Sequence, residues 1–497
     1  MNIEKYLKYK RGPFAQLLKG LLFLLLSCNS MPALGQQQRP NIILIIGDDI
    51  SRDDIGIYGR NTFIKTPNID GIAKDNGIRF DHFYVTSSSC SPSRTSLITG
   101  RYPHNSGTAE LHSPLPASQV YFPEILKNSG YFTAQLGKWH EGENTKRAYD
   151  TLVTGTALNG DGGEEQWIPL LSNRPKDKPF FFWLASFDAH RPWGADTTFP
   201  HNERNVLVPP TLVDSLNTRK DIASYYSEIE RLDFYVGKLV EALKAQHLYE
   251  NTVIVFIGDN GRPFPGDKTR LYDRGTNTPF LIRVPWIKPQ RPAINGLVSA
   301  IDVAPTILTL AQIKEDIPSV QGISFLSLLK GDADKFRNYI FTEHNWHDYK
   351  AYERAVRTSD FLYIENRLPD LSNQGPLDAV NSPSFKDLKK HKEEKKLTAL
   401  QNDVFLLPRP SEELYDVKSD SIQSNNLINN PRYNKELLRL KKVLHQWQYD
   451  TGDDFPTNLT PDWYGRIEGE TLPAKGTRGE MPGTKAKAIY INNKGAY

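Results

Sequence analysis

The sequence contains little cysteine: only Cys28 and Cys90 occur in 497 residues. It also lacks a basic excess, because the formal net charge of +3 includes +4 from residues 1–35 and leaves −1 on the rest of the chain. This balance argues against a nucleic-acid partner. The apolar run at residues 21–26 is too short to cross a bilayer, so we expect no transmembrane span. The remaining composition, with 38% hydrophobic and 24% charged residues, is typical of a globular protein.

The first 35 residues have the pattern of an export signal. Basic residues from Lys5 to Lys19 precede the apolar run at 21–26. Two processing routes remain open. Residues 33–35 have the small-x-small form of a signal peptidase site, whereas residues 25–28 resemble a bacterial lipobox that would place a lipid anchor on Cys28. The lipobox directly adjoins the apolar run, which favours that route. Either route predicts an exported protein, in the periplasm or at the cell surface.

Export also bears on the second cysteine. If Cys28 is removed or lipidated, Cys90 is the one remaining cysteine and the mature protein has no disulfide. A free thiol in an oxidising compartment is a liability unless it is chemically used. Cys90 is therefore either a buried, inert residue or a functional one.

The order of predicted elements indicates an α/β fold. Continuous apolar runs at 41–46, 179–187 and 252–257 are typical of parallel strands buried on both faces. A strand over 131–136 and helices over 67–76, 123–129, 221–246 and 301–311 alternate with them, and a further strand is expected over 80–84. The alternation predicts a large, mostly parallel sheet sandwiched by helices.

The pattern changes near residue 335. Short strands over 339–343 and 361–365, followed by an amphipathic helix over 434–449, predict a smaller C-terminal α+β subdomain. We expect a catalytic α/β domain over 39–335, the subdomain over 336–455 and a tail over 456–497. The tail, rich in Gly, Pro and Lys, either wraps the surface or is disordered. The lysine-rich run at 386–396 is expected to be a solvated face.

Polar clusters follow several predicted strands. Because ligands bind at the carboxyl ends of parallel strands, these clusters should meet at one edge of the sheet. They are Asp48-Asp49, Lys138-Trp139-His140, Asp188-Ala189-His190-Arg191 and Asp259-Asn260-Gly261.

The most informative motif is Cys90-x-Pro92-Ser93-Arg94, followed by Leu97-x-Thr99-Gly100-Arg101. It resembles the signature of the type I sulfatases, and the resemblance extends from Pro40 to about Asp454. It implies an alkaline-phosphatase-like fold. It also implies that a maturase oxidises Cys90 to Cα-formylglycine, whose hydrated aldehyde attacks the sulfur of a sulfate ester. Pro92 suits a first helical turn, so Cys90 should lie just before a helix N-terminus, which favours anionic charge.

The same resemblance assigns roles to the polar clusters. Asp48, Asp49, Asp259 and Asn260, together with Cys90, would bind one Ca²⁺ ion, in keeping with their hard oxygen ligands.

Catalytic roles also follow from the resemblance. Arg94 would hold the nucleophile, Lys138 and Lys268 would bind the sulfate, His140 would act as a general base and His190 would protonate the leaving oxygen.

Other residues are expected near the substrate or behind the motif. Arg191 and His344 are candidates for substrate binding, and His104 for support of the motif helix. Asp188 would orient His190 or touch substrate. Trp346 and His347 would line the pocket or belong to an ordinary surface loop.

The sequence is most similar to the branch of the family that contains N-sulfoglucosamine sulfohydrolase (sulfamidase) and bacterial polysaccharide sulfatases, including ulvan sulfatases. Residues 88–94 and 259–265 carry this likeness, but Lys268 stands where sulfamidase has arginine. We therefore expect a sulfatase acting on a sulfated glycan such as ulvan. The alternatives are a heparan N-sulfatase, a phosphonate or phosphate monoester hydrolase, and an inactive glycan-binding relative.

Overall fold

A computed structural model describes residues 39–193, 198–314 and 317–497. The expected signal peptide over 1–35, with its lipobox at Cys28, lies outside the described residues. Within the described part of the chain, no helix is both long and apolar enough to span a membrane. Residues 40–497 form one compact unit.

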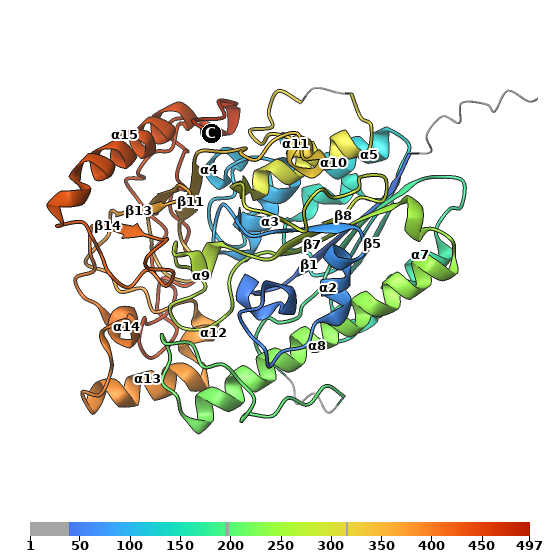
Figure 1. The fold of residues 1–497 in the computed structure, drawn as a ribbon. Helices are drawn as coiled ribbons and strands as arrows, with labels where there is room; N and C mark the ends of the chain where they lie inside the picture. Colours follow the sequence, from blue (N-terminus) through green and yellow to red (C-terminus); the bar gives the residue numbers. More distant parts are fainter. Residues whose placement is uncertain (1–38, 194–197, 315–316) are drawn as a thin grey trace, which may run out of the picture. The chain divides into compact units, whose positions relative to one another are not determined.

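An eight-stranded sheet forms the centre of this unit, with the strand order β5-β4-β6-β1-β7-β8-β2-β9 (Figure 1). The strands β1, β4, β5, β6 and β7 run parallel to their neighbours in this set, whereas β8 is antiparallel to both β7 and β2. The bounds are β1 Asn41–Gly47, β2 Gly77–Phe80, β4 Phe132–Gly137, β5 Thr151–Thr154, β6 Phe180–Ala185, β7 Thr252–Gly258, β8 Phe280–Arg283 and β9 Ala293–Ile294.

The central strand β1 is apolar because it is covered on both faces. Its residues alternate between two cores: Ile42, Leu44 and Ile46 face one core. Ile43 and Ile45 face the other. This alternation follows from the period of two in side-chain direction along a strand. The continuous apolar run in the sequence therefore reflects two buried faces.

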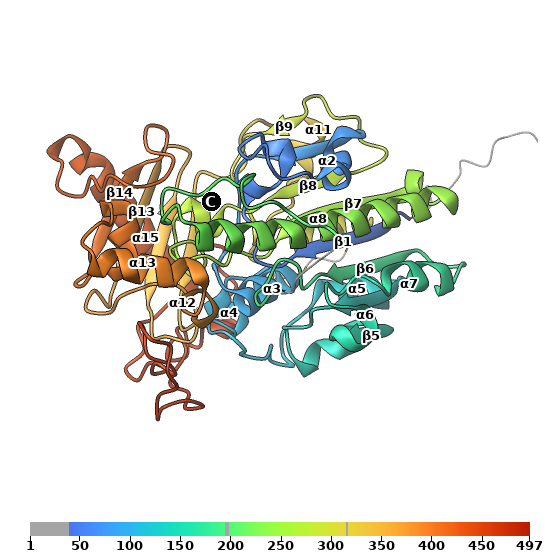
Figure 2. The same ribbon diagram turned by 90° about the horizontal axis from the view of Figure 1, so that it is seen from below.

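Helices cover both faces of the sheet, as Figures 1 and 2 show. The core that contains Ile43 and Ile45 includes apolar residues of α2 (Pro67–Lys74), α7 (Trp167–Asn173) and the long α8 (Leu216–Ala245). The opposite core includes residues of α3 (Cys90–Thr99), α5 (Phe122–Asn128), α10 (Val303–Leu310) and α11 (Leu326–Lys330). The predicted fold class, a mostly parallel sheet sandwiched by helices, is confirmed.

Strand register places the polar clusters at one edge of this sheet. Gly47 of β1 is paired with Gly258 of β7, so Asp48 and Asp259 leave the sheet side by side. Ala185 of β6 is paired with Gly137 of β4, so Lys138 emerges at the same edge. The loop after β6 is tied to β1 because the amide of Asp48 donates to the carbonyl of Asp188 at 2.7 Å.

A second, antiparallel sheet has the order β11-β12-β13-β14. Its strands are Ile340–His344, Glu353–Arg357, Phe361–Asn366 and Glu412–Asp416, and α15 (Asn434–Thr451) packs on it through Leu440, Leu444 and Trp447. The predicted C-terminal α+β portion is present. Three short helices, α12 (Leu377–Val380), α13 (Pro383–Glu393) and α14 (Ala399–Asn402), lie in the connection between β13 and β14.

The structure differs from one of the expected strands. The strand expected over 80–84 is two strands, β2 and the short β3 (Phe83–Tyr84), which pairs with β10 (Val298–Ser299). The tail after residue 455 packs on the rest of the unit. The guanidinium of Arg101, for example, donates to the carbonyls of Ile489 and Ile491 at 3.1 and 2.9 Å.

Candidate active site

Cys90 is the first residue of α3, one position further into the helix than the sequence suggested. All ten residues of α3 are buried, which explains why its sequence shows no amphipathic pattern. The Cys90 side chain is 2% exposed. Burial raises the pKa of its thiol well above the ordinary value. The unmodified thiol is therefore neutral at physiological pH and a poor nucleophile.

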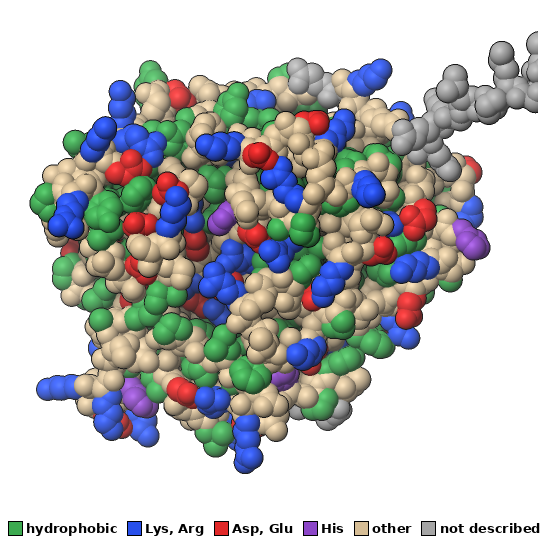
Figure 3. All heavy atoms as spheres, viewed as in Figure 1, with side chains coloured by type: hydrophobic (Ala, Val, Ile, Leu, Met, Phe, Trp, Pro, Cys, Tyr) green, Lys and Arg blue, Asp and Glu red, His purple; other side chains and the backbone are tan. Residues whose placement is uncertain are grey.

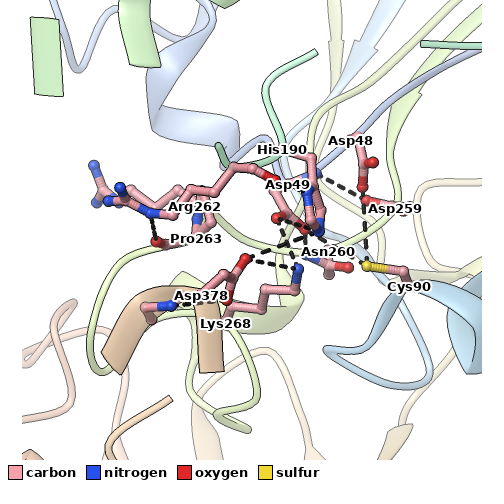
Figure 4. A network of polar contacts seen from close by, with 12 residues as sticks. Asp48, Asp49, Cys90, His190, Asp259, Asn260, Arg262, Pro263, Lys268 and Asp378 are labelled. Atoms are coloured by element: carbon pink, nitrogen blue, oxygen red, sulfur yellow. Dashed lines mark hydrogen bonds and ion pairs between the residues drawn. The ribbon is translucent and has the colours of Figure 1, made fainter. Parts of the chain in front are cut away.

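Acidic and amide side chains from the ends of β1 and β7 surround Cys90 (Figure 4). The Sγ atom lies 3.9 Å from Oδ1 of Asp48 and 3.7 Å from Oδ1 of Asp49. The amide of Asp49 donates to Oδ1 of Asp259 at 3.0 Å, and Nδ2 of Asn260 donates to Oδ1 of Asp49 at 2.6 Å. The five residues predicted to form the metal site are thus brought together.

These side chains are suited to a hard cation. One ligand atom each from Asp48, Asp49 and Cys90 lies within 4.8 Å of the others. The Oδ1 atom of Asn260 is buried and has no hydrogen-bond partner among the described residues. Buried acceptors are rarely left without a partner. A carboxylate-rich site with a free amide oxygen is typical of Ca²⁺ binding.

Three cations border the carboxylates. The Nε atom of Arg94 donates to Oδ2 of Asp259 at 2.8 Å. The ammonium group of Lys138 contacts Oδ2 of Asp48, and that of Lys268 lies 2.7 Å from Oδ2 of Asp49. Since three cations already balance three carboxylates, a bound divalent ion would leave the site with net positive charge. Such a site attracts an anion.

His140 pairs with a histidine that the sequence did not single out. Its Nε2 atom lies 2.7 Å from Nδ1 of His112, so one hydrogen is shared between the two rings. Burial, followed by the charge of Lys138, lowers the pKa of His140 well below its ordinary value. Burial also lowers the pKa of His112, to about 4. Both rings are therefore neutral near pH 7, which is the form that accepts a proton.

His190 presents one ring nitrogen toward two carboxylates. Its Nδ1 donates to the carbonyl of Arg191, which leaves Nε2 as the free nitrogen. Nε2 lies 3.9 Å from Oδ2 of Asp49 and 3.8 Å from Oδ2 of Asp378. Asp378, on α12, is a member of this site that sequence reasoning missed. It lies in a stretch without a recognisable motif, so only the contact with His190 reveals it.

The guanidinium donors of Arg191 are bonded to residues outside this cluster of carboxylates and cations. Its guanidinium makes two bonds to Asp221, at 2.7 and 2.8 Å, and one to the carbonyl of Pro263 at 2.9 Å. These contacts fix α8 to the loop after β7, which is typical of a structural residue. Asp188 likewise forms an ion pair with Arg231 of α8.

His344, at the end of β11, and His347, in the loop that follows it, are both buried. His344 is 4% exposed and lies 3.4 Å from Oε1 of Glu353. His347 is also buried, and its Nδ1 lies 2.7 Å from Oγ of Ser89, immediately before Cys90. His104 is bound at 2.9 Å to Glu343 of β11, which fixes the segment after α3 as expected for a supporting residue.

Arginine side chains also gather at a separate hollow of about 190 Å³. Figure 3 shows Lys and Arg side chains at the middle of this face, over the position of α9 (Asp273–Thr276) in Figure 1. Here Arg262 and Arg357 are paired with Asp267 and Asp273. Such pairing neutralises the positive charge, so this hollow is a weaker candidate for anion chemistry than the site around Cys90.

The fold and site define an α/β protein with a buried cluster of carboxylates and cations at the carboxyl edge of its sheet. The sequence model of the family described as Sulfatase matches residues 40–313, and that of N-sulphoglucosamine sulphohydrolase, C-terminal, matches residues 264–401. The chain belongs to the sulfatase family, whose members are sulfuric ester hydrolases.

Curated relatives agree with this membership. An "Ulvan-active sulfatase" of Formosa agariphila is 30% identical over 84% of this chain and 76% of its own length. The "N-sulphoglucosamine sulphohydrolase" of Homo sapiens is 28% identical over 91% of this chain and 96% of its own length. The predicted family and branch are confirmed.

Solved structures show the same fold. One, in complex with its substrate D-glucosamine-2-N,6-O-disulfate, has a TM-score of 0.63 at 20% identity and covers 83% of this chain and 98% of its own. Another, Ps i-CgsB in complex with k-i-k-neocarrahexaose, has a TM-score of 0.63 at 23% identity and covers 88% of this chain and 96% of its own.

Proposed function

We propose that this protein removes sulfate groups from a sulfated carbohydrate, using a formylglycine made from Cys90 and one bound Ca²⁺ ion. The observation that carries the proposal is the convergence of the buried side chains of Cys90, Asp48, Asp49 and Lys138. The high pKa of the Cys90 thiol supports a modified residue, because a neutral thiol is a poor nucleophile. A formylglycine there would supply a hydrated aldehyde as the nucleophile.

The oxygens of Asp48, Asp49, Asp259 and Asn260 would hold the ion. Calcium, when bound, supplies positive charge next to the nucleophile and the sulfate oxygens. Asn260 Oδ1 supports this assignment because it is buried without a partner among the described residues.

The chain's own cations bind the substrate anion in this proposal. Lys138 and Lys268 each contact a carboxylate oxygen of the cation site. Their ammonium groups would bind the sulfate oxygens, and Arg94 would hold the oxygen of residue 90. Charges that are fixed before the reaction stabilise developing negative charge efficiently.

Two histidines move protons at defined atoms. His140 is neutral and accepts the proton of the second hydroxyl group of residue 90 during sulfate release, with His112 as its hydrogen-bonded neighbour. His190, as an imidazolium, donates the hydrogen on Nε2 to the oxygen of the leaving sugar, while its Nδ1–H stays bonded to the Arg191 carbonyl.

The names of the relatives point to a glycan substrate. One is called ulvan-active, and another is named for N-sulphoglucosamine. The match of residues 264–401 to the C-terminal model of N-sulphoglucosamine sulphohydrolase favours an N-sulfated sugar as a second candidate. We further propose that residues 1–35 direct export, with a lipid anchor on Cys28 as one of the two processing routes, since a polymeric glycan is outside the cytoplasm.

The experiment is to express the protein with a formylglycine-generating maturase and to measure sulfate release. Ulvan oligosaccharides, N-sulfoglucosamine and a matched phosphate ester are compared by kcat/KM. Preference for the ulvan oligosaccharides supports the O-sulfatase, preference for N-sulfoglucosamine supports the sulfamidase, and preference for the phosphate ester contradicts both. The absence of any hydrolysis by protein with a converted residue 90 contradicts the enzyme assignment.

A further inference from the structure

Asp378 has an oxygen without a partner beside the reacting groups. Its Oδ1 accepts a hydrogen bond from the amide of Ala379 at 2.8 Å. Its Oδ2 is buried and has no hydrogen-bond partner among the described residues. A buried carboxylate oxygen normally accepts hydrogen bonds, so a vacant one next to a catalytic site requires an explanation.

The neighbours of this oxygen are close, but too far away for hydrogen bonds. Oδ2 lies 3.8 Å from Nε2 of His190 and 3.9 Å from Nζ of Lys268. Figure 4 shows Asp378 directed toward these two side chains. Both of them also approach Oδ2 of Asp49, at 3.9 and 2.7 Å. The ammonium of Lys268 already supplies the positive charge between the two carboxylates, so the pair does not require a second metal ion.

Asp378 is ionised in this environment. Burial acts to raise its pKa, but the charges of Lys268, His190 and Arg191 outweigh burial and lower the pKa below the ordinary value. A carboxylate accepts hydrogen bonds and repels other anions. The sulfate itself is therefore not the group that faces Asp378. The group must be a hydrogen-bond donor on the part of the substrate that approaches His190.

The space beside Asp378 is large enough for a sugar. Asp378 lines a hollow of about 560 Å³ together with Trp193, Lys220 and Asn381. A volume of this size is typical of small-molecule sites. The Trp193 ring provides an aromatic wall, which is held in place by Arg191 with its guanidinium carbon 3.9 Å from the ring centre.

We infer that Asp378 is a specificity-determining residue: its Oδ2 accepts a hydrogen bond from a donor on the carbon next to the one that bears the scissile sulfate. The inference rests on the proposed function, because His190 then marks the position of the leaving oxygen. A free hydroxyl at the neighbouring carbon satisfies the vacant oxygen. A second sulfate at that carbon is disfavoured by charge repulsion.

The test uses three matched sugar sulfates, which differ only at the carbon next to the scissile group: hydroxyl, deoxy or sulfated. Wild type should prefer the hydroxyl substrate over the deoxy one by about 10- to 100-fold in kcat/KM, the range of one hydrogen bond to a charged group. D378N should reduce this preference by about tenfold, because a neutral acceptor binds more weakly. It should also raise the relative rate on the doubly sulfated substrate. D370N, which removes an exposed carboxylate, is the control and should keep the wild-type ratios.

Two further measurements separate a binding role from a structural one. D378A should change the substrate ratios in the same direction as D378N, with a similar thermal midpoint. Equal losses on all three substrates, which would leave the ratios as in wild type, would mean that Asp378 acts through His190 or Lys268 and would overturn the inference. If wild type hydrolyses none of the sulfates, the proposed function fails first and the inference fails with it.

Discussion

Nε of Arg94 lies 2.8 Å from Oδ2 of Asp259, although the two residues are 165 positions apart in the sequence. This contact fixes the N-terminal half of α3 to the turn that follows β7. Both side chains are almost completely buried, with exposures of 0 and 1%. The predicted nucleophile and the predicted cation site therefore form one unit, and a change on either side should affect both.

The first prediction concerns calcium. Ca²⁺ should raise the thermal midpoint of unfolding, because it binds the folded state and not the unfolded chain. At 100 times its dissociation constant it should add about 2.7 kcal/mol. A chelator should remove both this increase and the activity, and Ca²⁺ should restore both. Differential scanning calorimetry with and without chelator measures the effect.

The matched variant for calcium is Asp259→Asn. It lowers the midpoint by itself because Arg94 loses its partner, so the quantity to compare is the Ca²⁺-induced increase. We expect that increase to be lost. An increase equal to that of wild type would exclude Asp259 from the cation site.

The second prediction concerns residue 90. Mass spectrometry of the tryptic peptide should show a loss of about 18 Da, the difference between a thiol side chain and an aldehyde, a change distinct from the usual oxidation of cysteine. Cys90→Ala should lower kcat by more than about 1000-fold, because the reacting group is gone. Full activity of this variant, or of protein with an unmodified peptide, would refute the role of residue 90.

The third prediction concerns Lys268. Its ammonium is 1% exposed and lies 2.7 Å from Asp49. Lys268→Ala should lower kcat/KM by about 100- to 1000-fold, the loss expected for one group that stabilises the transition state. Lys268→Arg should recover only part of this loss, since the larger planar guanidinium does not replace a point charge. Lys386→Ala, on the exposed side of α13, is the control and should behave like wild type.

The fourth prediction concerns pH and stability. Burial lowers the pKa of His347 well below its ordinary value, so the folded state keeps this ring neutral. The unfolded chain takes up a proton below about pH 6.5, and the free energy of unfolding should therefore decrease as the pH falls below that value. His347→Gln should reduce this slope by up to about 1.4 kcal/mol per pH unit. Urea unfolding between pH 7.5 and 4.5 measures it.

The comparison at pH 7.5 is the internal control for His347. The ring is neutral there in both states, so any difference between the two proteins reflects lost packing and the lost bond to Ser89. If the free energy of unfolding falls with the same slope against pH in wild type and variant over the acidic range, the prediction is contradicted.

The fifth prediction concerns the tail. Arg101 is 1% exposed. Its guanidinium donates to the backbone carbonyl of Asn105, which is nearby in the sequence, and to that of Ile491, which lies in the tail. Arg101→Ala should leave these acceptors unsatisfied and lower the free energy of unfolding by about 2–4 kcal/mol. A chain truncated after residue 455 should show a similar loss in urea unfolding. A truncated chain as stable as wild type would mean that the tail contributes nothing to the free energy of unfolding.

Much of the fold is predictable because burial on two faces leaves a clear apolar pattern. Strands β1, β6 and β7 have it. Strand β12 does not: it carries three charged residues in five, which are buried through ion pairs, such as Glu353 with Arg409 and Arg354 with Asp453. Its partners lie far along the chain, so its sequence resembles a loop.

The candidate site is predictable to a similar extent. The sequence predicts that polar residues directly after parallel strands, such as Asp48 and Asp259, lie close together, because sheet geometry brings strand ends together. His112 and Asp378 come from a loop and a four-residue helix, where no periodic pattern exists. Their positions depend on tertiary packing, which a local pattern does not contain.

The pairing of Gly47 with Gly258 means that the spacing of the candidate ion ligands is a property of the sheet as a whole. Inserting or deleting one residue within β1 would reverse the faces of every following side chain and move Asp48 away from Asp259. Such a change would disrupt both the candidate ion site and the packing of the two apolar cores. Loops at this edge can vary in length and composition without that penalty, so new substrate preferences should arise there while the two strands stay constant in length.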